Sequence, residues 1–275
     1  MTAERTQQTL NSTVVGEGPE SMVFLHGLMG RGKNFTTAAK DLADVATSLL
    51  VDLPNHGASP WTQDFSYVEV ADAVAEHLRT GFADRDPEGK VTLLGHSLGG
   101  KVAMVLALRH PELIRRLIIE DISPVSVSSF SEFEHLLGSL LSVDLDQLQR
   151  RSDADVQLTD KIRSRTVRGF LLQNLRSKRT EDGTTAFDWE PNLRLLYDSL
   201  DTIGGFPELD VAPFPGPVLW LGGERSPYIT DEAVEPMRAL FPKVRRMTIR
   251  DAGHWLHSEK PAEFAAALRF FLTQN

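Results

Sequence analysis

The 275-residue sequence contains no cysteine, so disulfide bridges, thiolate metal sites and a cysteine nucleophile are excluded. It also lacks any apolar run near the roughly 18 residues that a membrane-spanning helix needs. Residues 1–15 are polar and do not show the basic start and apolar run of a secretory signal. We therefore expect a cytoplasmic protein without a membrane span.

Basic residues are fewer than acidic ones: 29 Lys and Arg stand against 38 Asp and Glu, which gives a net charge of −9. An acidic chain repels the phosphates of nucleic acids and the surface of anionic lipids. We therefore expect neither nucleic acid nor membrane as a partner, and favour a small-molecule ligand. The sequence does not fix an oligomeric state.

Short β-rich apolar runs alternate with helical patterns over most of the chain. Seven runs are predicted to be strands: Leu10–Val15, Met22–Leu25, Ser48–Val51, Val91–Leu94, Leu117–Ile119, Val218–Leu221 and Val244–Ile249. Strands that alternate with helices form βα units, which assemble into a mostly parallel sheet flanked by helices. The predicted fold class is therefore α/β, with Leu10–Val15 at an edge of the sheet.

The alternation of strands and helices stops after Ile122. Residues 123–211 are mostly helical in pattern, rich in charge and without a convincing strand, and Thr180–Thr185 resembles an exposed turn. We interpret this segment as a helical cap inserted into a core of residues 1–122 and 212–275, since inserted segments often cover functional sites. The alternative is a separate helical domain that packs elsewhere.

The strongest chemical signal is Gly95–Gly99, with the sequence Gly-His-Ser-Leu-Gly, which follows a predicted strand and precedes a helical pattern. A serine nucleophile on a strand-to-helix turn needs glycine neighbours, because the strained backbone leaves no room for side chains. The turn lifts the hydroxyl above the sheet, and the amides at the start of the next helix face any negative charge beside it. We predict that Ser97 is a nucleophile.

A second element, His26-Gly27-Leu28, ends the predicted strand Met22–Leu25. Acyl transfer passes through an oxyanion, which two preorganised N–H donors can stabilise. We expect these donors to be the backbone amides of Leu28 and Leu98, with Gly27 allowing close approach and His26 in a supporting role. An ordinary glycine turn is the alternative.

The base must be chosen among eight histidines. His254 follows the last predicted strand and precedes the last helical pattern, which fits the chain order Ser, acid, His. His257 is the rival, but we expect it to face outward at the start of a helix. No third ligand accompanies these two histidines, so we expect no metal site. We interpret His56 and His96 as packing or pocket residues.

The acid must be a carboxylate that binds the second imidazole nitrogen of the base. Glu120 and Asp121 follow a strand, and we expect only one of them to face the site, because adjacent strand residues point to opposite faces. We favour Asp121, because ligands and catalysts gather at the carboxyl ends of parallel strands. Glu224 is the second choice; near it, Ser226 stands where an aspartate would be convenient.

Five segments carry a resemblance to a known family: His26–Leu28, Asp52–Ser59, Gly95–Lys101, Glu120–Pro124 and Ala252–Trp255. In combination they resemble the α/β-hydrolase superfamily, and the whole chain is similar to small bacterial acyl-ester esterases and their mitochondrial relatives of the abhydrolase domain-containing 11 type. The resemblance implies the α/β-hydrolase fold and a cofactor-free carboxylesterase that uses Ser97 and His254. Most members carry the triad aspartate at the position of Ser226, so this departure favours Asp121.

The expected activity is therefore a serine carboxylesterase that hydrolyses short- to medium-chain acyl esters through an acyl-enzyme on Ser97. The same fold could instead support haloperoxidase or perhydrolase chemistry, thioester hydrolysis or C–C bond hydrolysis, or bind a ligand without catalysis. Halide and epoxide chemistry is disfavoured because it needs a carboxylate at position 97. The motifs of nucleotide-binding proteins are absent.

Apolar residues at helical spacing occur early in the expected cap: Phe130, Phe133, Leu136 and Leu140. They either line an acyl pocket or form the cap's own core, and the sequence leaves both readings open.

Overall fold

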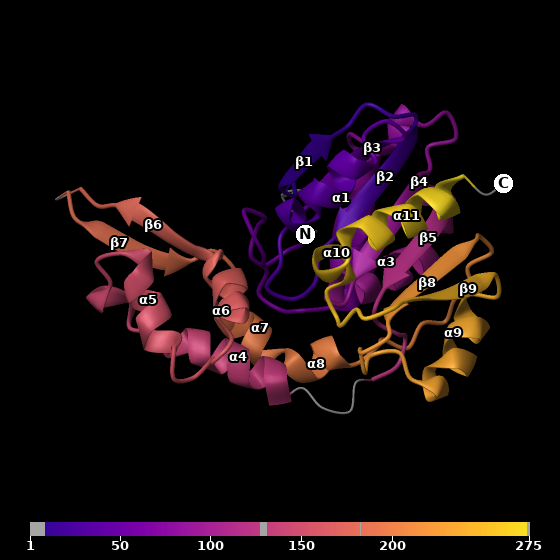
Figure 1. Ribbon diagram of the computed structural model, residues 1–275. Helices are drawn as coiled ribbons and strands as arrows, with labels where there is room; N and C mark the ends of the chain where they lie inside the picture. The colour runs from indigo at the N-terminus through magenta and orange to yellow at the C-terminus, as the bar shows by residue number, and fades with distance from the viewer. Residues whose placement is uncertain (1–8, 127–130, 182, 274–275) are drawn as a thin grey trace, which may run out of the picture.

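A seven-stranded sheet forms the centre of the computed structural model, which describes residues 9–126, 131–181 and 183–273 (Figure 1). In spatial order its strands are β1 (Ser12–Val15), β3 (Ala46–Val51), β2 (Glu20–Leu25), β4 (Val91–His96), β5 (Ile114–Glu120), β8 (Val218–Gly223) and β9 (Val244–Ile249). Only β1 pairs antiparallel, with β3; the other neighbours are parallel. The seven predicted strands and the α/β fold class are confirmed.

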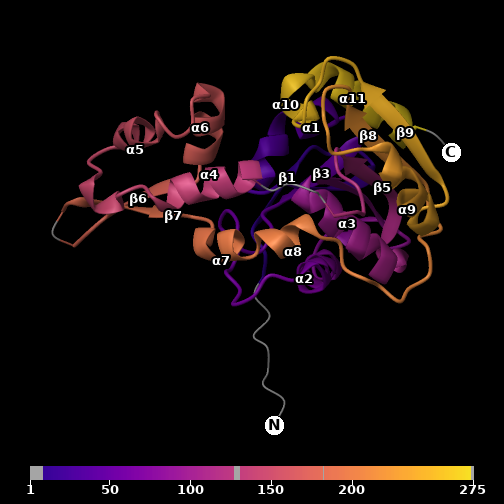
Figure 2. The same ribbon diagram turned by 90° about the horizontal axis from the view of Figure 1, so that it is seen from below.

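Both faces of the sheet are buried, which explains why its central strands are continuous apolar runs. On β2, Val23 and Leu25 belong to one hydrophobic cluster and Met22 and Phe24 to the other, as the alternation of strand side chains requires. The first cluster includes α2 (Tyr67–Arg79), α3 (Leu98–Arg109) and α9 (Val234–Leu240). The second includes α1 (Thr36–Asp41), α10 (Leu256–Glu259) and α11 (Pro261–Leu272), and Figure 2 shows these two helix layers with the sheet between them.

The chain between β5 and β8 contributes no described residue to the central sheet. Its elements are α4 (Ser131–Leu141), α5 (Arg151–Leu158), α6 (Arg165–Leu172), β6 (Leu175–Arg179), β7 (Thr185–Trp189), α7 (Leu193–Asp198) and α8 (Leu200–Gly204). Figures 1 and 2 show them beside the core rather than on its sheet. Short 3-10 helices complete the fold: Gly32–Phe35, Ala83–Arg85, Pro111–Leu113, Leu145–Gln147 and Asp231–Ala233. No helix within the described ranges is both long and apolar enough to cross a membrane.

The antiparallel hairpin of β6 and β7 corrects the expectation that this segment has no strand. Its sequence gives little strand signal, because only Leu175 and Trp189, at its base, are buried and most other positions are exposed. The expected turn at Thr180–Thr185 is the tip of this hairpin, where the Thr180 N–H donates to the Thr184 carbonyl over 3.0 Å.

A buried lysine ties both ends of the inserted segment to the core. Lys101 lies on α3, and its Nζ donates to the Val125 carbonyl over 3.1 Å and to the Gly204 and Gly205 carbonyls over 2.6 Å each. These three acceptors match the three N–H donors of an ammonium group. Tyr67 adds a fourth bond, from its hydroxyl to the Ile203 carbonyl over 2.6 Å. The segment is therefore held at its entry and at its exit.

Replacing Lys101 by Met should lower the free energy of unfolding by about 3 kcal/mol, because three carbonyls lose a charged donor. Urea unfolding followed by circular dichroism measures the loss. The matched control is Lys90→Met, which removes a partly exposed lysine paired with Glu88 and should cost less than about 0.5 kcal/mol. Equal losses in the two variants would contradict the role assigned to Lys101.

Candidate active site

The turn between β4 and α3 holds Ser97 in a strained conformation, with φ of 52° and ψ of −118°. Two glycines make the turn possible. A Cβ atom on Gly95 would overlap the Gly99 carbonyl, and one on Gly99 would overlap the carbonyl of Leu25 on β2. The Ser97 N–H donates to the Glu120 carbonyl over 3.0 Å, which fixes the turn against β5. Ser97 therefore stands at the carboxyl end of the sheet, where reactive groups gather in parallel α/β folds.

The structure brings His254 and Asp121 together. His254 Nδ1 lies 2.7 Å from Asp121 Oδ2, and the Asp121 side chain is fully buried. The carboxylate also accepts hydrogen bonds from the Gly223 N–H over 3.0 Å and from the Ser226 hydroxyl. The Asp121 carboxylate is thus held in place by three neighbouring groups. Ser226 supports an aspartate that comes from the neighbouring strand β5.

Glu224, the second candidate for the acid, has a different partner. Its Oε2 accepts a hydrogen bond from the backbone N–H of Asp251 over 2.9 Å. Glu224 thus braces the loop that leads to His254, at the backbone rather than at the imidazole.

Two expectations about neighbouring residues are wrong. His257 does not face outward: its side chain is 9% exposed, and its Nδ1 lies 2.8 Å from Glu120 Oε1. Glu120 and Asp121 also both face the histidine loop, because Asp121 follows the end of β5 with φ of 52° and so escapes the alternation of a strand. The result is two carboxylate–imidazole pairs side by side, formed by residues 120 with 257 and 121 with 254.

His96 connects these two pairs. Its ring centroid lies 4.7 Å from that of His254 and 5.0 Å from that of His257. Its Nε2 donates to the backbone carbonyl of His254 over 2.9 Å. Burial, helped by the charges of His254 and His257, holds the pKa of His96 well below its ordinary value. His96 therefore braces the backbone of the predicted base.

The loop that begins at His26 runs directly beside Ser97. A Cβ atom on Gly27 would lie 2.8 Å from His96 Nδ1 and 3.2 Å from the Ser97 Cβ, so only glycine fits there. His26 fixes the loop: its Nδ1 donates to the Gly27 carbonyl over 2.8 Å, and its Nε2 accepts from the Leu53 N–H over 3.0 Å. The backbone of Leu28 is thereby held near the turn.

The second predicted donor of the oxyanion site lies at a helix start. Leu98 is the first residue of α3, and the first N–H groups of a helix have no acceptor within it.

The inserted segment also contacts the loop that carries Leu28. Asn174 of this segment donates to the Met29 carbonyl over 2.8 Å and so anchors the loop.

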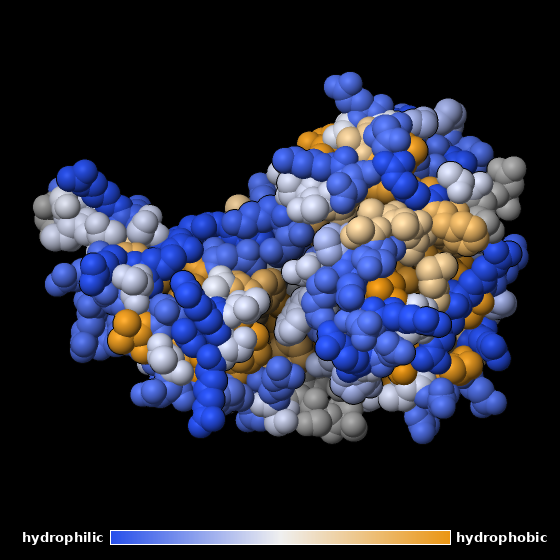
Figure 3. All heavy atoms as spheres, in the orientation of Figure 1, coloured by the Kyte–Doolittle hydropathy of each residue, from blue (hydrophilic) through white to orange (hydrophobic). Residues whose placement is uncertain are grey.

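Ser97 and His254 line one cavity of about 570 Å³, a volume that includes its opening to solvent. Most of its lining is apolar: Leu28, Met29, Phe35, Phe133, Leu136, Leu137, Val167, Phe170, Leu171 and Trp255. Helices α4 and α6 of the inserted segment supply about half of these side chains. Figure 3 shows that hydrophilic residues cover most of the visible face, while hydrophobic ones appear between this segment and the core.

Four apolar residues of the inserted segment were expected either to line an acyl pocket or to form the segment's own core. Phe133 and Leu136 line the cavity, and Leu136 also belongs to the hydrophobic core together with the fully buried Leu140. Phe130 lies outside the described residues.

His26 and His56 are buried as neutral rings in edge contact, with centroids 5.1 Å apart. Burial lowers the pKa of His26 to about 4 and that of His56 to about 3. His56 is fully buried against His26 and is therefore a packing residue. Its Nδ1 lies 3.1 Å from the Pro54 carbonyl.

Acid should destabilise the protein through these rings. Because the folded-state pKa of His26 lies below its unfolded value of 6.5, the unfolded chain binds the extra proton first as the pH falls. The free energy of unfolding should therefore fall by about 3 kcal/mol between pH 6.5 and about 4 through this residue alone. Urea unfolding across this range should show a smaller fall in His26→Gln, while His135→Gln, at an exposed histidine, should behave like the original chain. Identical pH dependence in the two variants would refute this account.

Comparison with known proteins places the fold in a family. Residues 20–261 match the alpha/beta hydrolase fold family. The sn-1-specific diacylglycerol lipase ABHD11 of Danio rerio is 37% identical over 264 residues, covering 94% of this chain and 80% of that protein. Esterase YbfF of Escherichia coli is 30% identical, covering 91% and 92%. A solved marine microorganism esterase is 32% identical with a TM-score of 0.88, covering 96% and 99%. The chain therefore belongs to the α/β-hydrolase family.

Proposed function

We propose that this protein is a serine carboxylesterase that hydrolyses short- to medium-chain acyl esters through an acyl-enzyme on Ser97. The observation that carries the proposal is the 2.7 Å contact between His254 and Asp121 beside the apolar cavity that Ser97 also lines. The relatives are named as esterases and a diacylglycerol lipase, which supports ester hydrolysis as the reaction class.

Asp121 sets the tautomer of the base. A buried carboxylate at His254 Nδ1 holds the ring proton there, so Nε2 carries the lone pair. Nε2 takes the proton of the Ser97 hydroxyl while the oxygen attacks the ester carbonyl. Asp121 stabilises the imidazolium that results, and the Leu28 and Leu98 N–H groups bind the oxyanion.

The tetrahedral intermediate then collapses to an acyl-enzyme, which water hydrolyses in a second stage. His254 returns its proton to the leaving alcohol, which departs and leaves the acyl group on Ser97. Water enters, gives a proton to His254 and attacks the acyl carbonyl, and the carboxylic acid leaves as the proton returns to the Ser97 oxygen. The reaction needs no cofactor.

The inserted segment acts as a cap in this proposal. Residues 123–211 cover a core of residues 1–122 and 212–275, and Phe133, Leu136 and Phe170 give the cavity its apolar wall. An apolar lining suits an acyl chain, because burying each CH₂ group contributes about 0.8 kcal/mol. The partner of the protein is therefore a small-molecule ester.

Replacing Ser97 by Ala should lower kcat for a chromogenic butyrate ester by at least about 10⁴-fold, because no acyl-enzyme forms. The matched control is Ser177→Ala, at an exposed serine on β6, which should keep full activity. Labelling with a fluorophosphonate probe should disappear in Ser97→Ala only, with the circular dichroism spectrum unchanged. Substantial turnover by Ser97→Ala would exclude the proposed nucleophile.

Asp121→Asn should reduce kcat by about 10⁴-fold, because an amide at Nδ1 favours the wrong tautomer of His254. Glu224→Gln is the matched control, because it changes a carboxylate that contacts only the loop backbone, and it should lower kcat less than about tenfold. Steady-state kinetics on the same ester measures both. If Glu224→Gln alone is severe, Asp121 is not the acid.

A further inference from the structure

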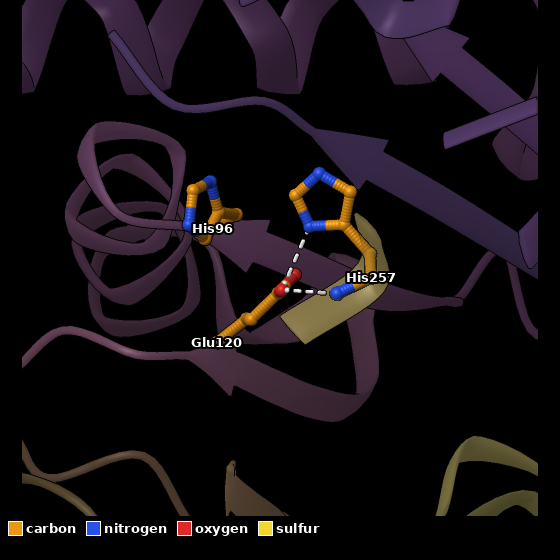
Figure 4. Close-up of side chains that lie close together, drawn as sticks. All are labelled: His96, Glu120 and His257. Carbon is orange, nitrogen blue, oxygen red and sulfur yellow. Dashed lines mark hydrogen bonds and ion pairs between the residues drawn. The ribbon is translucent and has the colours of Figure 1, made fainter. Parts of the chain in front are cut away.

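Three possible metal ligands converge behind the loop that carries His254. They are His96 at the end of β4, Glu120 at the end of β5 and His257 on α10 (Figure 4). Each offers one nitrogen or oxygen atom, and these atoms lie within 4.8 Å of one another. Because His257 lies 137 positions from Glu120 and still further from His96, no spacing in the sequence indicates a third ligand for His257.

The Glu120 carboxylate is the unusual member of this set. Its side chain is fully buried, and Oε1 accepts from the backbone N–H of His257 over 3.1 Å and contacts His257 Nδ1 over 2.8 Å. The other oxygen, Oε2, is buried and has no hydrogen-bond partner. Both oxygens of a buried carboxylate normally accept hydrogen bonds or bind a metal ion. An ion pair with His257 accounts for Oε1 and leaves Oε2 unexplained.

An ion could reach these residues from solvent. His96 and His257 line the same cavity as Ser97, and His257 also lines an adjoining cavity under α6 and α10. Two of the three ligands therefore face a cavity that opens to solvent.

The donor set selects the class of metal. Two imidazole nitrogens and one carboxylate oxygen suit Zn²⁺ and its neighbours Co²⁺, Ni²⁺ and Cu²⁺, whereas Mg²⁺ and Ca²⁺ prefer oxygen ligands alone. Tetrahedral zinc with bonds of about 2.0 to 2.1 Å needs ligand atoms about 3.3 Å apart. Ligand atoms at the observed limit of 4.8 Å would have to approach each other by about 1.5 Å to bind such an ion.

We propose that His96, Glu120 and His257 form a binding site for Zn²⁺ and similar transition metals, and that its occupation inhibits the enzyme. A metal at His257 Nδ1 displaces the proton that this nitrogen shares with Glu120. Turning the His96 ring toward the metal breaks its 2.9 Å bond to the His254 carbonyl. The base then loses its backbone support while Ser97 remains free. The inhibition, though not the binding, rests on the proposed esterase function.

Calorimetric titration of the purified full chain with Zn²⁺, after treatment with a chelator, tests the site directly. We expect one zinc ion per chain and at least about tenfold weaker binding in Glu120→Gln and in His257→Gln. Glu224→Gln, which changes a nearby carboxylate outside the set, should bind like the original chain. The visible absorption spectrum of the Co²⁺ complex should show tetrahedral coordination and change in Glu120→Gln.

Binding is measured without turnover, and Ser97→Ala should bind zinc normally, so failure of the esterase assignment and failure of the metal site give different results. In the active chain, Zn²⁺ should inhibit hydrolysis, and a chelator should restore the activity. The His257→Gln variant should need at least about tenfold more zinc for the same inhibition. Unchanged zinc binding in a folded Glu120→Gln or His257→Gln overturns the proposal. So does loss of binding in His254→Gln with binding kept in Glu120→Gln, because the ion would then lie on the His254–Asp121 pair.

Discussion

The contact between three backbones at the Ser97 turn is the constraint on which the rest of the site depends. Strand β2, strand β4 and helix α3 approach so closely that Gly95 and Gly99 have no space for a Cβ atom. This approach fixes the loop after β2 against the start of α3. The two amides that we assign to the oxyanion, at Leu28 and Leu98, are therefore placed by the same packing that shapes the turn.

The second organising feature is the doubled carboxylate–imidazole arrangement at the end of β5. A left-handed residue at Asp121 directs two consecutive acidic side chains to the same loop. Both imidazoles line the cavity, and Glu120 and His96 also bind the backbone of residues 257 and 254. Buried charge is costly, so this density of titratable groups in a packed core points to a requirement of function rather than of stability.

The sequence predicted the central sheet because strands buried on both faces are continuous apolar runs, which stand out in the chain. It missed the β6–β7 hairpin because exposed strands carry no such run. Ser97, His254 and Asp121 could be selected by motif, chain order and strand end, and their assigned roles stay predictions. Glu120 was misjudged because the rule of alternating side chains ends with the strand, one residue before Asp121. His257 was misjudged because its buried partner, Glu120, is distant in the chain.

Lys101 was overlooked although it is the only charged residue between Ser97 and Arg109 in an otherwise apolar helix. Its three bonds have a mechanical consequence for the segment they hold. Besides these two ends, Asn174 donates to the Met29 carbonyl over 2.8 Å and the Asn192 N–H donates to the Asn55 carbonyl over 3.0 Å, so the segment is fastened to the core at these four places. Any displacement of α4 or α6 over the cavity is therefore transmitted to the loop of Leu28 and to the helix that begins at Leu98.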